Sequence, residues 1–283
     1  GKPTMLNNVE TLANIAPILL NGAEWYRSIG TANSPGTKLF TVCGNVVRRG
    51  VFEFPMGVNL KDIIYEVCGG IADGKGLLGV QTGGTSGAII NADQIDMTLD
   101  IDTVSASGGR LGCGTILVID DSNCIVDIVR NNLDFFRGES CGKCTPCREG
   151  GQQLYNLVTR ISRGLATLPD LEKIDELTET MRLTALCGLG HSTAVPVQTS
   201  IQNFRKEYLA HIDRDYCPVC TQAAVAEGIY EAEEDYRNDG NSRMGRRRAA
   251  VGERDVMYDS YARHRSRGTS YAGQFKRRGG REA

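Results

Sequence analysis

The chain has 283 residues, of which 41% are hydrophobic and 23% charged, and its formal net charge is −2. These values are ordinary for a soluble globular protein of one or two domains. No run of 18 or more apolar residues occurs, and no charged-then-apolar signal segment opens the sequence. Composition therefore argues against a membrane-spanning or secreted chain and favours a cytoplasmic one.

The ten cysteines are distributed unevenly. A long chain without a signal segment argues against a disulfide framework. Six of the cysteines lie after residue 140, where the chemistry is expected. The other four stand singly among apolar residues and are predicted to be small buried hydrophobes: Cys43, Cys68, Cys113 and Cys124.

The first segment is predicted to be an extended start followed by a helix. Asn7 is the predicted N-cap, with Glu10 three residues later in capping-box fashion. An interior-looking helix cap without an initiator Met suggests that the chain starts within a domain. Residues 1–35 are therefore expected to be the remnant of a preceding domain.

Residues 36–120 carry strand patterns around one short helix. Two β-branched runs joined by a turn at Asn45 to Gly50 predict a hairpin. NLKDIIYEVCGGI predicts an amphipathic helix that ends at two glycines. Three more strands are predicted in GLLGVQTGG, GAIINA and GTILVIDD, so this segment is expected to form a small α+β sheet domain.

The glycines of Q-T-G-G-T-S-G raise the question of a phosphate-binding loop. The P-loop lysine is missing and no long helix follows. Gly83, Gly84 and Gly87 are therefore interpreted as a turn of the sheet.

Residues 121–215 have helical periodicity, with four predicted helices. The first closes on Gly138 and the second on Gly164. The third, PDLEKIDELTETMRLTALCG, begins with its proline and aspartate, and VPVQTSIQNFRKEYLAHI is predicted to be one continuous fourth helix. Short connections predict a small bundle.

Between the first two of these helices lies a C-x2-C-x2-C loop, at Cys141, Cys144 and Cys147. Three thiolates at this spacing can each bind a different iron of a cubane cluster. Zinc sites usually pair two separate C-x2-C knuckles, so a third cysteine at the same spacing favours iron–sulfur over zinc. The loop does not continue with the C-x3-C-P of bacterial ferredoxins, so the fourth ligand must come from elsewhere.

Two candidates for the fourth ligand remain from spacing alone. Cys187 lies in A-L-C-G-L-G between two helices, where glycines let backbone N–H groups approach a cluster. The rival is the pair Cys217 and Cys220 in Y-C-P-V-C. His191, four residues after Cys187, is interpreted as a polar neighbour and not as a ligand.

Three motifs in chain order carry a family resemblance: K-P-T-x-x-N-N-V-E-T-L-A-N, E-S-C-G-x-C-T-P-C-R-E-G and L-C-G-L-G. Over residues 1–216 the chain resembles the C-terminal part of the NADH-binding flavoprotein subunit of respiratory complex I. It also resembles the counterparts of that subunit in soluble NAD-linked hydrogenases and formate dehydrogenases. The resemblance implies a β-grasp-like (ubiquitin-like) domain at 36–120 and a four-helix-type bundle at 121–215. It also implies one [4Fe–4S] cluster on Cys141, Cys144, Cys147 and Cys187.

In such proteins a preceding domain binds FMN and NADH, and the reduced flavin passes single electrons to the cluster. The resemblance implies flavin contacts for Asn7, Asn8 and Thr11, although a plain helix cap explains the same residues. The flavin loop and the NADH-binding segment are not in this sequence, so the isolated chain is not expected to oxidise NADH.

The implied partners are a [2Fe–2S] thioredoxin-like subunit and a further iron–sulfur or hydrogenase subunit. The implied location is the cytoplasm or the cytoplasmic face of a membrane complex.

Residues 216–283 are expected to be a low-complexity, disordered tail. Residues 238–283 hold 12 Lys and Arg against five Asp and Glu. Such a tail without a folded module is interpreted as solvated, with no nucleic acid expected. The competing hypothesis for the whole chain is a zinc-stabilised, non-redox interaction module whose tail binds nucleic acid.

Overall fold

The computed structural model describes residues 1–213, 217 and 219. The chain divides into two compact units, Gly1–Thr221 and Gln222–Ala283, and the described residues all belong to the first. Apart from Cys217 and Val219, the predicted basic tail lies outside them. No helix in the described part is long and apolar enough to cross a bilayer.

The first helix, α1 (Val9–Asn21), is followed by the short α2 (Ala23–Arg27). Its N-cap is Asn8 and not the predicted Asn7. The extended backbone of Asn8 lets its Oδ1 accept from the backbone N–H groups of Glu10 at 2.8 Å and Thr11 at 3.4 Å. The side chain of Asn7 instead accepts from the N–H of Asn8 at 2.9 Å. None of the residues of α1 is buried.

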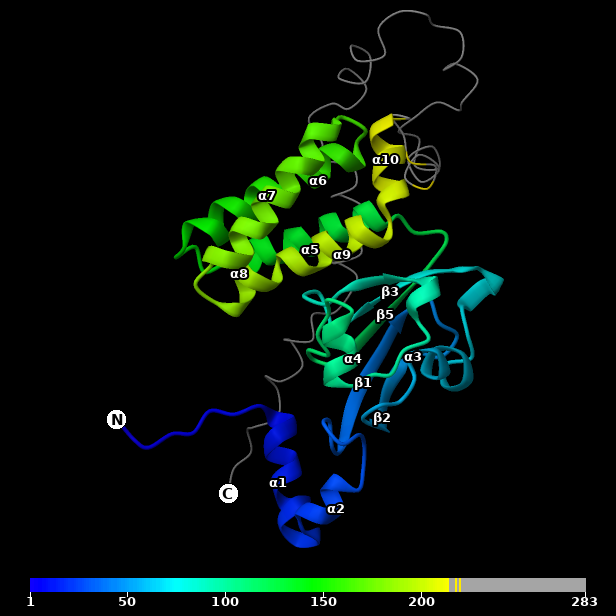
Figure 1. The fold of residues 1–283 in the computed structure, drawn as a ribbon, viewed down its shortest axis with the longest axis vertical. Coiled ribbons are helices and arrows are strands. Elements are labelled where there is room, and N and C mark those ends of the chain that lie inside the picture. The colour runs from blue at the N-terminus through cyan, green and yellow to red at the C-terminus, as the bar shows by residue number, and fades with distance from the viewer. Residues whose placement is uncertain (214–216, 218, 220–283) are drawn as a thin grey trace, which may run out of the picture. The chain divides into compact units, whose positions relative to one another are not determined.

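Five strands form one mixed sheet, in the order β2-β1-β5-β3-β4 (Figure 1). The predicted hairpin is confirmed, because the first two strands pair antiparallel, and the other three predicted strands are confirmed as well. The first strand also runs parallel to the last. The bounds are β1 (Thr37–Gly44), β2 (Gly50–Pro55), β3 (Leu77–Thr82), β4 (Ile89–Asn91) and β5 (Thr115–Asp120).

The glycine-rich segment after β3 is the turn between β3 and β4, as interpreted from the sequence. Gly83 has φ +78° and Gly84 has φ +85°, the left-handed backbone that glycine adopts without a steric cost. A side chain at Gly87 would overlap the carbonyl oxygen of Thr82. These glycines thus serve a tight turn.

Both faces of the sheet are covered, because alternate residues of a strand point to opposite sides. In β5, Ile116 and Val118 join a core with the helical segment at 60–67, while Ile119 joins a second core with the later helices. That helical segment consists of α3 (Leu60–Asp62) and a π-helical turn (Ile63–Val67), and it was predicted as a single helix.

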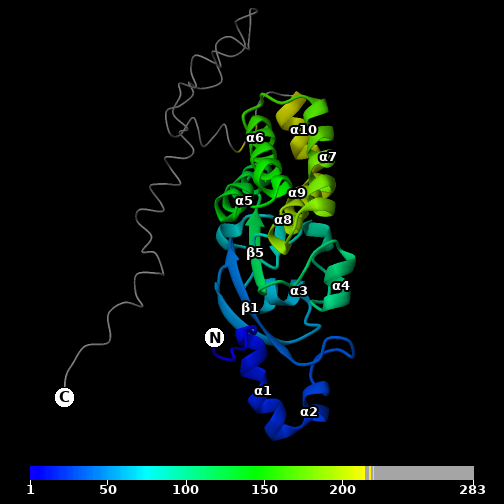
Figure 2. The same ribbon diagram turned by 90° about the vertical axis from the view of Figure 1, so that its left-hand side faces the viewer.

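A short helix that the sequence analysis missed, α4 (Ile101–Ala106), lies on the same side as α3. Its N-cap Asp100 accepts from the N–H of Thr103 at 2.7 Å. In both views the sheet lies between α1 and α2 on one side and the later helices on the other (Figures 1 and 2).

The sequence pattern described the later helices only in part, because it missed the short helix Gly188–Ser192, and the third predicted helix ends at Thr184, before its A-L-C-G. The predicted fourth helix is broken at Phe204, whose φ of −128° is not helical. Phe204 is buried, and its ring approaches Gly79 of the sheet, a tertiary contact that periodicity does not reveal. The first helix also runs past Gly138. The bounds are α5 (Ile125–Glu139), α6 (Gly151–Ser162), α7 (Leu168–Thr184), α8 (Gly188–Ser192), α9 (Ala194–Asn203) and α10 (Arg205–Asp213).

The helices are joined to the sheet through β4. The N–H of Ile89 donates to Thr199 Oγ1 at 3.0 Å, and Asn203 Nδ2 donates to the carbonyl of Ile89 at 2.8 Å. Side chains of α9 therefore satisfy backbone groups of a strand at the edge of the sheet. These two hydrogen bonds join α9 to the edge of the sheet.

Candidate metal centre

The three closely spaced cysteines lie in the connection between α5 and α6. Ser140 has an extended backbone that ends α5, and Gly142 has φ +72°, which makes the sharp bend between Cys141 and Cys144. Cys147 lies in a π-helical turn (Pro146–Gly150) that leads into α6. Cys141 is exposed, Cys144 half-buried and Cys147 buried.

Cys187 reaches this loop because α8 packs against it. Cys187 is the extended N-cap of α8 and is exposed. A Cβ placed on Gly190 would lie 3.3 Å from Cβ and 3.6 Å from Sγ of Cys147, and only 2.5 Å from Cβ of Ala185. The absence of a side chain at Gly190 thus lets the segment that carries Cys187 approach Cys147.

The thiol of Cys144 lies where backbone donors favour its thiolate. The N–H of Leu186 is the main cause that lowers the pKa of Cys144, followed by the N–H of Cys147, and the charge of Arg148 adds to the effect. Iron binds thiolates and not thiols, so the lowered pKa suits a ligand. The hydrogen bond from the Leu186 N–H is also a second contact between the segment that carries Cys187 and the cysteine loop.

Two polar side chains hold the backbone around these cysteines. Arg148 Nη1 donates to the carbonyl of Gly142 at 2.5 Å, and its Nε pairs with Glu149 at 2.9 Å. His191 Nε2 contacts the carbonyl of Ala185, and since a carbonyl only accepts, this nitrogen must carry the proton. This placement agrees with the interpretation of His191 as a polar neighbour.

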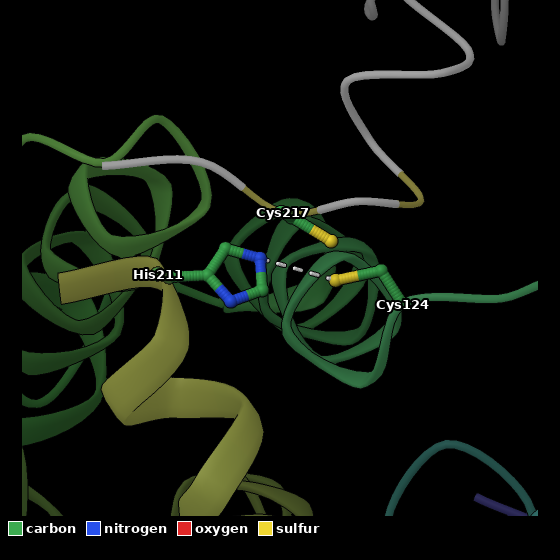
Figure 3. Close-up of side chains that lie close together, drawn as sticks. All are labelled: Cys124, His211 and Cys217. Atoms are coloured by element: carbon green, nitrogen blue, oxygen red, sulfur yellow. Dashed lines mark hydrogen bonds between the residues drawn. The ribbon is translucent and has the colours of Figure 1, made fainter. Parts of the chain in front are cut away.

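Cys217, the rival candidate for the fourth ligand, lies elsewhere. Its Sγ is within 4.8 Å of Cys124 Sγ and of a ring nitrogen of His211 (Figure 3). Cys124 directly precedes α5, whereas Cys141 follows its end, and a helix of 15 residues spans about 22 Å. The structure therefore brings Cys187 to the loop and leaves Cys217 at the other end of α5. Cys220 lies outside the described residues.

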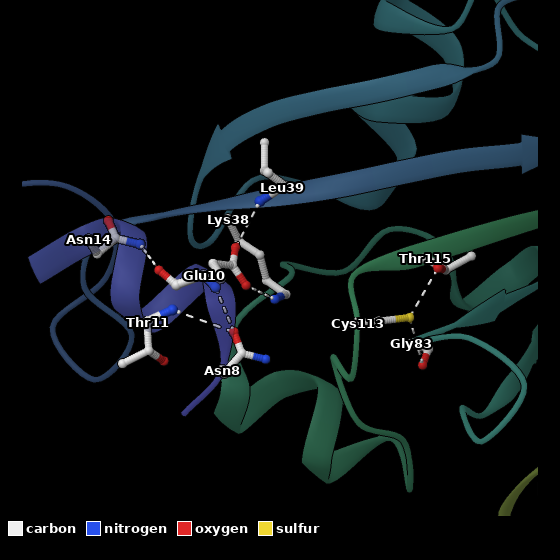
Figure 4. Close-up of polar contacts among 9 residues, drawn as sticks. All are labelled: Asn8, Glu10, Thr11, Asn14, Lys38, Leu39, Gly83, Cys113 and Thr115. Atoms are coloured by element: carbon white, nitrogen blue, oxygen red, sulfur yellow. Dashed lines mark hydrogen bonds and ion pairs between the residues drawn. The ribbon is translucent and has the colours of Figure 1, made fainter. Parts of the chain in front are cut away.

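The prediction that the four singly placed cysteines are small buried hydrophobes was partly wrong. Cys68 and Cys124 are buried, Cys43 is half-buried, and Cys113 is exposed. Cys113 lies near the turn after β3, where its Sγ is 3.1 Å from Thr115 Oγ1 (Figure 4). Cys124 is buried but has His211 and Cys217 as neighbours, which its isolated position in the chain could not indicate.

The residues expected to contact a flavin, Asn7, Asn8 and Thr11, are all exposed at the start of α1. The Oδ1 atom of Asn8 is engaged in capping the helix (Figure 4). Glu10 anchors the same turn to the sheet, because it pairs with Lys38 at 2.8 Å and accepts from the N–H of Leu39 at 3.1 Å. Burial acts to raise the pKa of Glu10, but the contacts with Lys38 and with the N–H of Leu39 outweigh it, so the pKa is lowered.

The four predicted cluster ligands differ from the group of Cys124, His211 and Cys217 in the distances between their ligand atoms. Among the described residues, the group whose ligand atoms all lie within 4.8 Å of one another is Cys124, His211 and Cys217. In a cubane each thiolate binds a different iron, so its ligands are more widely separated than those of one ion. The all-thiol donor set, the backbone N–H groups directed at Cys144 and the close approach at Gly190 fit an iron–sulfur cluster on the loop.

Comparison with known proteins agrees with this interpretation. Residues 127–211 match the NADH-ubiquinone oxidoreductase-F iron–sulfur binding region family. The chain is 43% identical over 222 residues to HndC, a subunit of the NADP-reducing hydrogenase of Solidesulfovibrio fructosivorans, a match covering 78% of this chain and 45% of the relative. It is 38% identical over 218 residues to the F 2 protein of the NADH-quinone oxidoreductase of Rhizobium meliloti, with coverages of 77% and 52%.

A solved structure matches as well. The air-oxidized NAD+-reducing [NiFe]-hydrogenase aligns with a TM-score of 0.68 at 39% identity, covering 75% of this chain and 36% of the hydrogenase chain. This chain spans about half the length of the curated relatives it matches. None of these matches supports the zinc-stabilised interaction module. Residues 127–211 belong to the NADH-ubiquinone oxidoreductase-F iron–sulfur binding region family, within a chain related to the F-type proteins of NADH-quinone oxidoreductases and to their hydrogenase counterparts.

Proposed function

We propose that this chain binds one [4Fe–4S] cluster through Cys141, Cys144, Cys147 and Cys187 and serves in electron transfer. The observation that carries the proposal is the packing of residues 186–190 on the cysteine loop, with the Leu186 N–H directed at Cys144 and Gly190 against Cys147. When bound, a cluster of this kind accepts and releases one electron at a time.

The residues of the chain orient the thiolates and determine how much water reaches them. Arg148 fixes the carbonyl of Gly142 and so the bend of the loop. Its positive charge lies near Cys144, where it favours negative charge on sulfur. Cys147 is shielded, whereas Cys141 and Cys187 are exposed, so one side of the site is open to a redox partner.

The complete protein is proposed to be part of a multi-subunit NADH dehydrogenase, NAD-linked hydrogenase or formate dehydrogenase. In it NADH reduces FMN, and electrons then pass singly to the cluster. Asn7, Asn8 and Thr11 are the proposed flavin contacts in this chain. The proposed partners are a [2Fe–2S] thioredoxin-like subunit and a further iron–sulfur or hydrogenase subunit, and the proposed location is the cytoplasm or the cytoplasmic face of a membrane complex.

The domain division belongs to the same proposal. We assign residues 1–35 to a flavin-domain remnant, 36–120 to a β-grasp-like domain, 121–215 to a four-helix-type bundle and 216–283 to a tail. The antiparallel pairing of β1 with β2, together with the parallel pairing of β1 with β5, supports the β-grasp assignment. The packing of α5 with α6 and α9 in one apolar core supports the bundle.

Anaerobic purification of the chain tests the proposal. We expect a brown protein with about four irons and four sulfides per chain and a paramagnetic signal after reduction. A colourless protein that holds zinc at Cys141, Cys144 and Cys147 would overturn the cluster and restore the interaction-module hypothesis. NADH oxidation by this chain alone would contradict the assignment of flavin and NADH binding to a separate segment.

A further inference from the structure

A second group of metal-ligand side chains lies at the start of α5. Cys124 is the N-cap of α5, His211 lies in the last turn of α10, and Cys217 comes from the segment after α10. These side chains converge from three separate parts of the chain (Figure 3). Cys124 and Cys217 are each 6% exposed and His211 is 2% exposed, so the group is enclosed by the protein.

The spacing of the ligand atoms matches a single ion. With Zn–S near 2.3 Å and Zn–N near 2.0 Å, a tetrahedral site separates sulfur from nitrogen by about 3.5 Å. Cys124 Sγ lies 3.4 Å from His211 Nε2, and all three ligand atoms lie within 4.8 Å of one another. Two thiols and one imidazole are also the donor types of many zinc sites.

The tautomer of His211 is set for binding. His211 Nδ1 lies 2.7 Å from the carbonyl oxygen of Glu207. Since a carbonyl only accepts, Nδ1 carries the proton, and the lone pair of Nε2 faces Cys124. A backbone carbonyl behind a histidine ligand is the usual way in which proteins orient an imidazole toward a metal.

The electrostatic surroundings also favour a cation. Glu207 Oε2 accepts from the N–H of Ile125, the residue after Cys124, at 3.3 Å. Two thiolates beside this carboxyl group in an apolar core would repel one another and lose hydration. A divalent cation that displaces the two thiol protons makes the group neutral with a neutral imidazole.

We propose that Cys124, His211 and Cys217 bind one divalent cation of the zinc class. The ion ties the start of α5, the end of α10 and the segment at Cys217 together, as structural zinc does. The site is separate from the cysteine loop and does not depend on the proposed electron-transfer function. Cys220 follows at zinc-knuckle spacing but lies outside the described residues, and the proposed site consists of the three described ligands.

The first test uses the full wild-type chain and Zn²⁺ as the probe. The chain is stripped with a chelator, reloaded with or without zinc, and alkylated, and each cysteine peptide is quantified by mass spectrometry. We expect zinc to slow alkylation of Cys124 and Cys217 at least about tenfold while Cys43 reacts at an unchanged rate. Protection confined to Cys141, Cys144 and Cys147, or a Cys124–Cys217 disulfide in the peptide map, would overturn the proposal.

The second test compares zinc affinity among variants by competition with a chelator. His211→Gln should weaken binding about a hundredfold or more, since it removes a ligand. Cys43→Ser is the matched control and should keep wild-type affinity. Cobalt(II) in place of zinc should give the visible bands of a tetrahedral thiolate site, and these bands should be lost in His211→Gln. Equal zinc affinity in both variants, or a wild-type chain that binds no zinc outside the cysteine loop, would refute the site.

Discussion

At the C-terminal end of α5, three cysteines spaced three residues apart lie in a partly exposed connection, and Cys187 joins them from the start of α8. At the N-terminal end, Cys124 meets His211, which is 87 residues away in sequence, in a buried position with ligand atoms at single-ion distances. The first arrangement suits a polynuclear cluster that exchanges electrons with partners, and the second suits a buried structural ion. One helix thus separates the proposed cluster site from the proposed site of a single ion.

The largest effect is expected when one thiol is removed at each end of α5. Cys187→Ser should lose most of the iron, because a cluster ligand is removed, yet keep zinc protection of Cys124. Cys217→Ser should keep wild-type iron and lose zinc. Metal analysis of both variants by mass spectrometry measures this crossed result. Equal iron in the two variants would mean that the choice of Cys187 as the fourth ligand is wrong.

Removal of iron alone should destabilise the helices around the cysteine loop. A cluster joins the connection after α5 to the segment after α7, and metal binding of this kind contributes to folding. We expect Tm to fall by about 5 °C or more, with faster hydrogen exchange in residues 140–150 and 186–192 than in the sheet. A thermal melt that does not change after iron removal would count against a structural role for the cluster.

A smaller effect is expected from Gly190→Ala, which alters the approach of α8 to the loop. The added Cβ would lie 2.5 Å from Cβ of Ala185 and 3.3 Å from Cβ of Cys147, so stability should fall by about 1–3 kcal/mol, with reduced iron content. The matched control is Gly188→Ala in the same helix, where an added Cβ meets nothing within 4 Å. Urea unfolding and iron analysis compare the two variants, and the same loss in both would show that the close contact is unimportant.

The smallest effect concerns pH in the iron-free chain. Backbone N–H groups lower the pKa of Cys144, whereas burial raises the pKa of Cys43. The pH profile of alkylation should therefore have its midpoint below that of a simple thiol for Cys144 and above it for Cys43. The stability that these donors contribute is present above the ordinary thiol pKa and is lost as the pH falls through the lowered value. Coincident profiles for the two cysteines would contradict the assigned contacts.

The sequence predicted the strands and most helices well because their apolar periodicity reports burial directly. It failed where a tertiary contact overrides local preference. The buried ring of Phe204 divides a helix whose pattern looked continuous, and Asn8 displaced Asn7 as the cap. The short α4 carried too few periodic positions to be detected.

The sequence alone determined the C-x2-C-x2-C loop. Its three cysteines are so close in sequence that a single turn of the chain brings them together. Spacing alone left the fourth ligand open between Cys187 and the pair Cys217 and Cys220, and the packing of Gly190 on Cys147 favours Cys187. The group of Cys124, His211 and Cys217 was decided by tertiary structure alone. Cys124 is distant in sequence from His211 and Cys217, and only the folding of α10 back against the start of α5 brings the three side chains within 4.8 Å of one another.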